Sequence, residues 1–359
     1  MAIKDLVLVT GGTGYVATFT LYQLLQRGYT VRTTVRNVSR SSELNKDLIN
    51  LNSIKHNQLS YFAADLTKDN GWEEAIKDCE YILHIASPIS GGQATDEEMV
   101  TPAKVGTLRV LNLALKYGVK RVVIMSSCAA ITYNELKPDP VTGAPPLLDE
   151  SVFSSDKVIP NSYSRSKLVQ ERAVWDWLKA PANKDAANPV EVAVLNPPGI
   201  FGPNVPGKQS QAAVTVIGNL INGRSKTGLP RLYFGSCDVR DVAYLTYRAM
   251  IEPKAKNERF IVDSTDKPDL SMFELVQVIR KHYSITENNK DGKVNLNNLA
   301  ARELPSWLVR VLSYVMPPLR LIVPYLDIKK HTTNAKAVKT FNWKPIQVDE
   351  SVIATIDTM

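Results

Sequence analysis

Tyr163 and Lys167 are the side chains in this sequence whose types and spacing best suit proton transfer. They stand four residues apart in the segment 161–167 (NSYSRSK), so a helix would place them on one face. A phenol has an unperturbed pKa of about 10, and a nearby ammonium favours the phenolate. Such a pair can exchange a proton near neutral pH. The same spacing also occurs where the tyrosine is half-buried and the lysine solvated, so the rest of the chain must supply a cofactor and a third group.

A glycine-rich turn near the start of the chain predicts a dinucleotide site. Residues 6–10 (LVLVT) form a continuous apolar run typical of a buried parallel strand, and residues 15–27 have helical periodicity. Between them, GGTGYVA (residues 11–17) satisfies two spacings of the dinucleotide fingerprint. Small residues there let a pyrophosphate reach the backbone N–H groups at the start of a helix. The expected contacts are Gly11, Gly14, Tyr15 and Val16.

The second predicted strand, residues 29–35, ends at an arginine where many NAD sites carry an acid. That acid, about 20 residues beyond the glycines, binds the ribose 2′-hydroxyl. Here Arg36 occupies the position, Arg40 follows, and no acid appears before Glu43. Guanidinium groups match a 2′-phosphate in charge and geometry, although both could instead be solvated loop charges. We therefore expect NADP(H) as the cofactor, with Arg36 and Arg40 at its 2′-phosphate.

Strands and helices alternate through the first half of the chain. Further strands are predicted at residues 59–64, 81–85, 121–125 and 190–195. The alternation predicts an α/β fold with a doubly wound parallel sheet of the Rossmann type, and ligands at the carboxyl ends of its strands. Ser127 and the start of the Tyr163 helix should both lie at this edge. The other cofactor contacts expected there are Asp65, Leu66, Ala86, Ser87, Pro197, Gly199 and Ile200.

The character of the chain changes after the segment NPPGIFGP (residues 196–203). We expect residues 1–197, with 236–264 returning to them, to form the dinucleotide-binding domain. Residues 198–235 and 265–359 should form a smaller, mostly helical substrate lobe. The loops at 129–160 and 204–233 are expected to decide which substrate binds. His84, inside a predicted strand, is expected to be a hydrogen-bonded core residue and not a catalyst.

Composition argues against several classes of protein. A hydrophobic fraction of 44% and a charged fraction of 22% are ordinary for a soluble globular protein. The net charge of +7 is spread among acids, which gives little support to a nucleic-acid partner. The three cysteines and four histidines are far apart, predicting reduced cysteines and no metal site.

No signal-peptide pattern is seen at the start of the sequence. The most apolar stretch, residues 307–323, is interrupted by arginines and prolines, which argues against a membrane span. It favours amphipathic helices, with contact to a membrane surface as the alternative. We expect a cytoplasmic monomer or homodimer whose partner is a small carbonyl compound.

Several motifs occur together in a recognisable order. TGGTGYVA (10–17), Asp65-Leu66, MSS (125–127), YSRSK (163–167) and NPPGIFGP (196–203) resemble the extended branch of the short-chain dehydrogenase/reductase superfamily. Within it, VRTTVR (31–36), ILHIASP (82–88) and the Pro102/Gly106/Thr107 pattern are similar to the dihydroflavonol-4-reductase group, which includes fungal methylglyoxal and ketone reductases. The resemblance spans residues 6–265 and is weaker in the tail.

This resemblance implies a catalytic trio of Ser127, Tyr163 and Lys167 and an NADPH-dependent reduction of an aldehyde or ketone. Tyr163 would protonate the developing alkoxide as general acid. Ser127 would donate a hydrogen bond to the same oxygen. Lys167 would lower the pKa of Tyr163 and bind the nicotinamide ribose. The cofactor itself supplies the hydride chemistry.

Two departures from the group bear on the substrate. Thr132 stands where plant flavonoid reductases carry Asn or Asp, and NSYSR (161–165) replaces the NWYCY signature of cinnamoyl-CoA reductases. The alternatives are a nucleotide-sugar epimerase or dehydratase, which Arg36 argues against, and a hydroxysteroid dehydrogenase. A regulator that senses NADP(H) without turnover is a further alternative, and it would not need the tyrosine–lysine pair. The sequence leaves the substrate open.

Overall fold

A sheet of seven parallel strands forms the centre of the molecule, in the order β3-β2-β1-β4-β5-β6-β11. The computed structural model describes residues 5–50, 58–88, 94–137, 143, 145–205, 211–264 and 270–359. The strands are β1 (Leu6–Val9), β2 (Thr30–Val35), β3 (Leu59–Ala63), β4 (Tyr81–His84), β5 (Arg121–Met125), β6 (Glu191–Asn196) and β11 (Glu258–Ile261). The predicted α/β class is confirmed.

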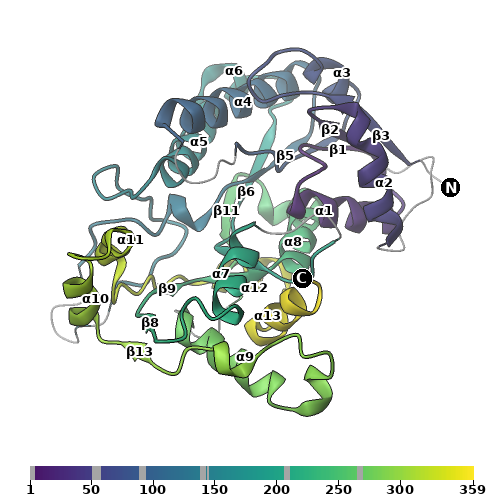
Figure 1. The fold of residues 1–359 in the computed structure, drawn as a ribbon. Helices are drawn as coiled ribbons and strands as arrows, with labels where there is room; N and C mark the ends of the chain where they lie inside the picture. Colours follow the sequence, from purple (N-terminus) through teal and green to yellow (C-terminus); the bar gives the residue numbers. More distant parts are fainter. Residues whose placement is uncertain are drawn as a thin grey trace.

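Helices cover both faces of this sheet (Figure 1). One layer holds α1 (Tyr15–Gln26), α2 (Ser41–Asn50), α8 (Val239–Ile251) and α12 (Ala335–Phe341); the other holds α3 (Trp72–Ile76), α4 (Asp96–Lys116), α5 (Ser162–Lys179) and α6 (Pro181–Lys184). Alternate strand residues enter opposite cores: Val7 and Val9 pack with the first layer, and Leu8 packs with the second. Because both faces are covered, the central strands β1, β4 and β5 are buried along almost their whole length.

The direction of chain progression across the sheet reverses between β1 and β4. The loops that follow these two strands therefore diverge, and a crevice opens at the carboxyl ends of the strands. The glycine-rich turn follows β1, and Ala86 follows β4. This topology places the predicted cofactor segments at one edge of the sheet.

A second, largely helical region has its own hydrophobic core. It is built on α7 (Gln211–Ile221), α9 (Met272–Tyr283) and α13 (Val348–Asp357), with Phe201 and Leu229 among the buried side chains. Short strand pairs border it: β7 (Gly199–Phe201) with β10 (Ser236–Asp238), β8 (Leu229–Pro230) with β13 (Glu303–Leu304), and β9 (Tyr233–Phe234) with β12 (Leu270–Ser271). The helical C-terminal region expected from the sequence is present.

The apolar stretch 307–323 folds into two short helices, α10 (Ser306–Leu312) and α11 (Pro317–Arg320). Several of its large side chains face solvent, including Trp307 and Tyr314. Among the residues that the structure describes, no helix is both long enough and apolar enough to cross a membrane. The three cysteines are unpaired and buried, as predicted.

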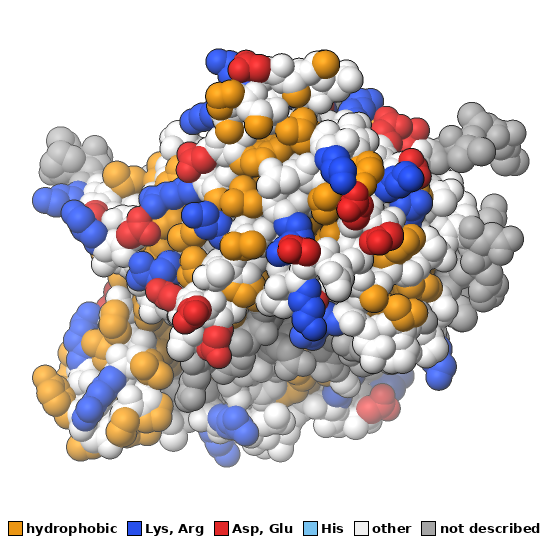
Figure 2. All heavy atoms as spheres, turned by 90° about the horizontal axis from the view of Figure 1, so that it is seen from above, with side chains coloured by type: hydrophobic (Ala, Val, Ile, Leu, Met, Phe, Trp, Pro, Cys, Tyr) orange, Lys and Arg blue, Asp and Glu red, His pale blue; other side chains and the backbone are white. Residues whose placement is uncertain are grey.

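Charges of both signs are mixed on the face that α3–α6 cover. Figure 2 shows Lys and Arg side chains there lying among Asp and Glu and separated by apolar patches. A nucleic-acid footprint would require basic residues gathered on one face. The charge pattern on this face therefore resembles that of an ordinary globular surface.

Candidate active site

The glycine-rich turn after β1 packs tightly against its neighbours. Gly11 has a φ of +72°, and its N–H donates to Thr34 Oγ1 at 2.9 Å. The N–H of Gly12 donates to the Thr34 carbonyl at 2.9 Å. A Cβ on Gly11 would lie 3.1 Å from the Cα of Ala86. The turn therefore depends on glycine both for its left-handed backbone and for the close approach of the chain that follows β4.

The start of α1 is well placed to bind an anion. Gly14 is its N-cap, and no side chain within the described part of the chain caps the helix there. The first backbone N–H groups of a helix have no intrahelical partner and carry the positive end of its dipole. The Tyr15 hydroxyl donates to the Pro203 carbonyl at 3.1 Å, so its ring is engaged with that segment. We expect the backbone N–H groups of Tyr15 and Val16 to contact the pyrophosphate.

At the end of β2, Arg36 is exposed and lies close enough to Asp65 to act on its charge. Hydrogen bonds from Thr67 are the main cause of the lowered pKa of the Asp65 carboxyl, and the Arg36 charge lowers it further. The Thr67 N–H and hydroxyl donate to Asp65 Oδ1 at 2.8 and 2.7 Å. Arg40 ends the short helix η1 (Val38–Arg40), but its side chain lies outside the described residues. The expected cofactor contact of Asp65 stays a prediction.

The other expected cofactor residues lie at the neighbouring strand ends. The N–H of Ala86 donates to Thr10 Oγ1 at 2.9 Å, which ties the end of β4 to β1. Leu66 packs against Gly106 of α4, and Ser87 is half-buried. Past β6, Pro197 precedes β7, in which Gly199 is exposed and Ile200 is half-buried. Their contacts with a nucleotide stay predictions.

Ser127 and Tyr163 come together at this edge from different elements. Ser127 follows β5 and caps the short helix η2 (Cys128–Ala130), accepting from the Ala129 N–H at 3.1 Å. Tyr163 lies in the first turn of α5, which Asn161 caps by accepting from the Ser164 N–H at 2.8 Å. The two side chains lie close enough for Ser127 to act on the pKa of the Tyr163 phenol.

The pKa of the Tyr163 phenol is raised overall. Its side chain is 41% exposed, yet the surrounding protein desolvates the phenol enough to raise its pKa, while the nearby Ser127 side chain acts to lower it. Lys167 is not among the groups acting on the phenol. The expected lowering of the Tyr163 pKa by Lys167 stays a prediction, and Ser127 acts on the phenol in that direction.

Lys167 is buried one turn further along α5. Its ammonium donates to the Met125 carbonyl at 3.0 Å and reaches Gln170 Oε1 at 3.5 Å. Burial lowers the pKa of the ammonium to about 8, and the charge of Glu171 acts to raise it. A lysine with such a pKa changes its charge in the range where many enzymes work.

His84 is a core residue, as predicted. Its two ring nitrogens face the hydroxyls of Thr10 and Thr107 at 3.1 and 3.2 Å. Burial lowers its pKa to about 3, with the Lys167 charge acting in the same direction. The Gln170 amide donates to Thr107 at 2.8 Å. A chain of hydrogen bonds therefore runs from Lys167 through Gln170 and Thr107 to the neutral His84.

A buried network around Glu171 was not predicted from the sequence. Its carboxylate accepts from Ser126 Oγ at 2.5 Å and from Asn196 Nδ2 at 2.7 Å. It also pairs with Arg259 of β11, whose Nε lies 2.7 Å from Oε1. The available signals were a glutamate four residues after Lys167, on the same helix face, and an arginine inside an apolar strand.

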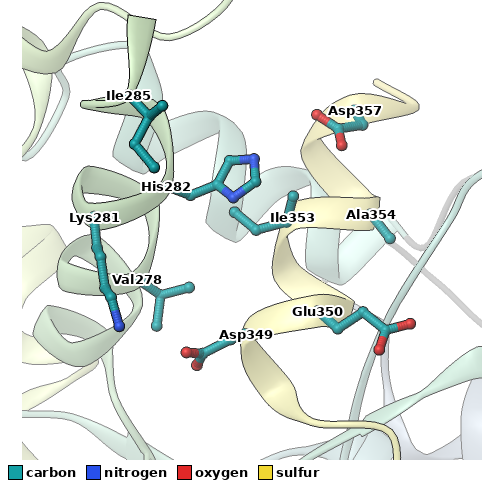
Figure 3. Close-up of a pocket in the computed structure, with 9 residues that line it drawn as sticks. All are labelled: Val278, Lys281, His282, Ile285, Asp349, Glu350, Ile353, Ala354 and Asp357. Atoms are coloured by element: carbon teal, nitrogen blue, oxygen red, sulfur yellow. The ribbon is translucent and has the colours of Figure 1, made fainter. Parts of the chain in front are cut away.

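A separate pocket of about 450 Å³ lies between α9 and α13. Figure 3 shows Val278, His282 and Ile353 facing one another across it, with acidic side chains along α13. Two of these acids already have partners: Glu350 pairs with Arg240, and Asp357 accepts from Tyr283. The pocket contains none of the predicted site residues.

Comparison with known proteins gives a consistent set of similarities. A family model described as the NAD dependent epimerase/dehydratase family matches residues 7–262. Cinnamoyl-CoA reductase CAD2 of Medicago truncatula is 31% identical over 289 residues, covering 78% of this chain and 82% of that protein. A ketoreductase of Aspergillus niger is 30% identical over 275 residues, covering 71% and 76%.

Two solved structures share the fold along nearly the whole chain. Gre2 of Candida albicans in complex with NADPH superposes with a TM-score of 0.76 at 22% identity, covering 99% of this chain and 98% of that chain. Yeast methylglyoxal/isovaleraldehyde reductase Gre2 with NADPH also gives 0.76, at 20% identity, covering 98% and 97%. At these identities the likeness establishes the architecture.

Proposed function

The chain belongs to the NAD dependent epimerase/dehydratase family, and we propose that within it the protein is an NADPH-dependent reductase of aldehydes or ketones. The observation that carries this proposal is the nearness of Ser127 to Tyr163, close enough for the serine to act on the pKa of the phenol, at the sheet edge where the glycine-rich turn lies. Two hydroxyls that meet in this way can together bind one carbonyl oxygen. The reductases among its relatives point in the same direction.

The residues present fit NADP(H). Gly11 leaves room that a Cβ would fill against Ala86, and the uncapped start of α1 can receive the pyrophosphate. Arg36 is exposed at the end of β2, where a 2′-phosphate would lie. The two Gre2 structures with the same fold hold NADPH. NADP(H) is accordingly the cofactor in this proposal.

When bound, NADPH supplies the hydride for the carbonyl carbon, and the residues of the chain manage the oxygen. The raised pKa of Tyr163 keeps its phenol protonated at neutral pH, which is the form that a general acid needs. Ser127 donates to the Pro197 carbonyl at 3.4 Å, a long bond that it can exchange for one to the substrate oxygen. Lys167 would bind the nicotinamide ribose, and its effect on the Tyr163 pKa stays a prediction.

The site defines the substrate only as a compound with a reducible carbonyl group. The chain is similar to a cinnamoyl-CoA reductase. Around Tyr163, however, it carries NSYSR (161–165) in place of the NWYCY signature of those enzymes, which argues against their substrate. The loops expected to decide it include residues 138–142, 144 and 206–210, which lie outside the described residues. The proposal is therefore limited to aldehydes and ketones as a class.

The test is NADPH consumption over a panel of aldehydes, ketones, dicarbonyls and UDP-sugars. The wild-type protein should reduce at least one aldehyde or ketone and leave UDP-sugars unchanged. Tyr163→Phe should lower kcat by about 10²–10⁴-fold, the usual contribution of a general acid, while NADPH binding is kept. Tyr22→Phe, a half-buried tyrosine of α1, is the matched control and should keep full activity. A Tyr163→Phe protein as active as wild type would refute the assignment.

A further inference from the structure

Glu171 is a carboxylate with no solvent exposure and several polar partners. It accepts from Ser126 at the end of β5 and from Asn196 at the end of β6, and it pairs with Arg259 of β11. Trp175, one turn later, donates to it at 3.3 Å. Burying a charge costs several kcal/mol unless paired groups offset the cost. The network thus links three strands to α5 through a group that is costly to bury.

Two of these partners, Ser126 and Asn196, are connected to Ser127. Ser126 is its neighbour in sequence, and the Asn196 amide that donates to Glu171 also donates to the Ser127 carbonyl at 3.1 Å. Tyr163 lies on the same helix as Glu171, two turns earlier. The carboxylate therefore fixes the distance between the strand end that carries Ser127 and the helix that carries Tyr163.

Titratable groups face Glu171 from three sides. Arg259 faces it from β11 and Lys167 from its own helix. The third is the Cys128 thiol of η2, whose pKa is raised chiefly by burial, with a smaller contribution from Glu171. Beyond Lys167, His84 of β4 is kept neutral by burial. Arg259 is also held by the Glu150 and Val152 carbonyls at 3.3 and 3.0 Å. Of the groups described, Glu171 is the one whose charge acts to keep Lys167 protonated.

We propose that Glu171 is a positioning residue: it holds Ser127 in place relative to Tyr163 and stabilises the Lys167 ammonium. Its effect on turnover rests on the proposed function. Its effect on Lys167 can be measured through NADPH binding alone, because the ammonium is expected to contact the nicotinamide ribose.

Glu171→Gln tests both effects, because glutamine keeps the shape and one acceptor oxygen but removes the charge. Displacing catalytic groups by about 1 Å can cost about a hundredfold in rate, so kcat should fall about tenfold to a hundredfold with little change in KM. In wild type, NADPH affinity should weaken as the pH rises through about 8. Without the Glu171 charge, burial lowers the Lys167 pKa further, so the same weakening should begin at lower pH.

Asn196→Ala separates the positioning effect from the electrostatic effect. It also tests the positioning effect if the Glu171→Gln protein does not fold. It breaks the link to Ser127 and keeps the carboxylate charge. We expect kcat to fall while the pH dependence of NADPH binding stays that of wild type. Asp241→Asn removes another buried carboxylate, on α8, and should leave both kcat and that pH dependence unchanged.

Each result decides one part of the proposal. If Glu171→Gln keeps kcat within about twofold of wild type, or if Asn196→Ala loses no activity, the positioning effect is refuted. The electrostatic effect is refuted if the NADPH affinity of wild type does not change with pH near 8. It is also refuted if Glu171→Gln does not shift the pH dependence of NADPH affinity. Failure of wild type to reduce any carbonyl would instead refute the proposed function, and the NADPH titration would still test Glu171.

Discussion

Gly12 offers a sharp test of how the dinucleotide turn is built. Its φ is not among the left-handed values of the described glycines, so alanine meets no backbone strain there. A Cβ at this position would nevertheless lie 2.2 Å from Thr33 Oγ1 and 3.0 Å from its Cγ2. Thr33 is fully buried and donates to the Val9 carbonyl at 2.8 Å, so it cannot simply rotate away.

Gly12→Ala should therefore be destabilising and should weaken NADPH binding. Overpacking of a tight interior typically costs about 1–3 kcal/mol, and the gain of about 0.4–1 kcal/mol from a stiffer unfolded chain offsets only part of that cost. If the turn moves away from β2 to relieve the contact, it moves toward the place where the pyrophosphate should lie. We expect NADPH affinity to fall at least about tenfold, or about 1.4 kcal/mol.

The double variant Gly12→Ala/Thr33→Ala tests whether the clash is the cause. Thr33→Ala removes both atoms nearest to the new Cβ, and it also loses the bond to Val9. Each single variant should be less stable than wild type. The double variant should be more stable than the sum of the two losses predicts, by about 1–3 kcal/mol, the usual range for residues in contact. Urea unfolding of the four proteins measures this coupling.

Gly28→Ala provides the matched control. Gly28 has a φ of +79°, and a Cβ added to it would meet no atom within 4 Å, so alanine there meets backbone strain without a clash. The substitution should cost about 1–2 kcal/mol, and Thr33→Ala should not rescue it. Additive losses for Gly12→Ala and Thr33→Ala, or an equal rescue of Gly28→Ala, would refute the steric explanation.

Two further predictions concern charge. Arg36→Ala should lower the preference for NADPH over NADH, measured as the ratio of the two dissociation constants, by about tenfold or more because a charge-assisted bond to the 2′-phosphate is lost; an unchanged ratio would remove Arg36 from that role. Burial raises the pKa of Asp241 to about 6, so the folded protein binds a proton more tightly than the unfolded chain, and stability is lost as pH rises from about 4 to 6. Asp241→Asn should therefore gain about 2 kcal/mol relative to wild type between pH 4.5 and 7 in urea unfolding, and an equal difference at both pH values would contradict this.

The centre of the sheet could be predicted because its middle strands are nearly continuous apolar runs. β1, β4 and β5 are buried on both faces, so their sequences need no alternation and stand out between polar loops. The glycine-rich turn was equally visible, since its geometry depends on residues that lack side chains. By contrast, α2 was missed because it is a polar helix with a narrow apolar stripe, and the short pairs such as β8 with β13 depend on tertiary contact alone.

The sequence indicated which side chains are candidates for chemistry, but not which residues support them. Tyr163, Lys167 and Ser127 carry chemistry that their types and spacing indicate. Glu171 and Arg259 leave only weak local signals in the sequence, and these signals do not show that the two charged side chains pair. Their pairing joins two segments far apart in the chain and could be known only once β11 was placed beside β6.

The arrangement also explains why the site should respond to changes far from the reacting atoms. Tyr163, Lys167 and Glu171 follow one another at intervals of four residues on α5, and a helix keeps such residues on one side. The three residues share one helix, whereas Ser127 follows β5. The bonds from Glu171 to Ser126 and Asn196 connect these two elements beside the site. The distance between the two hydroxyls should therefore depend on this network more than on the packing of α5 against α4.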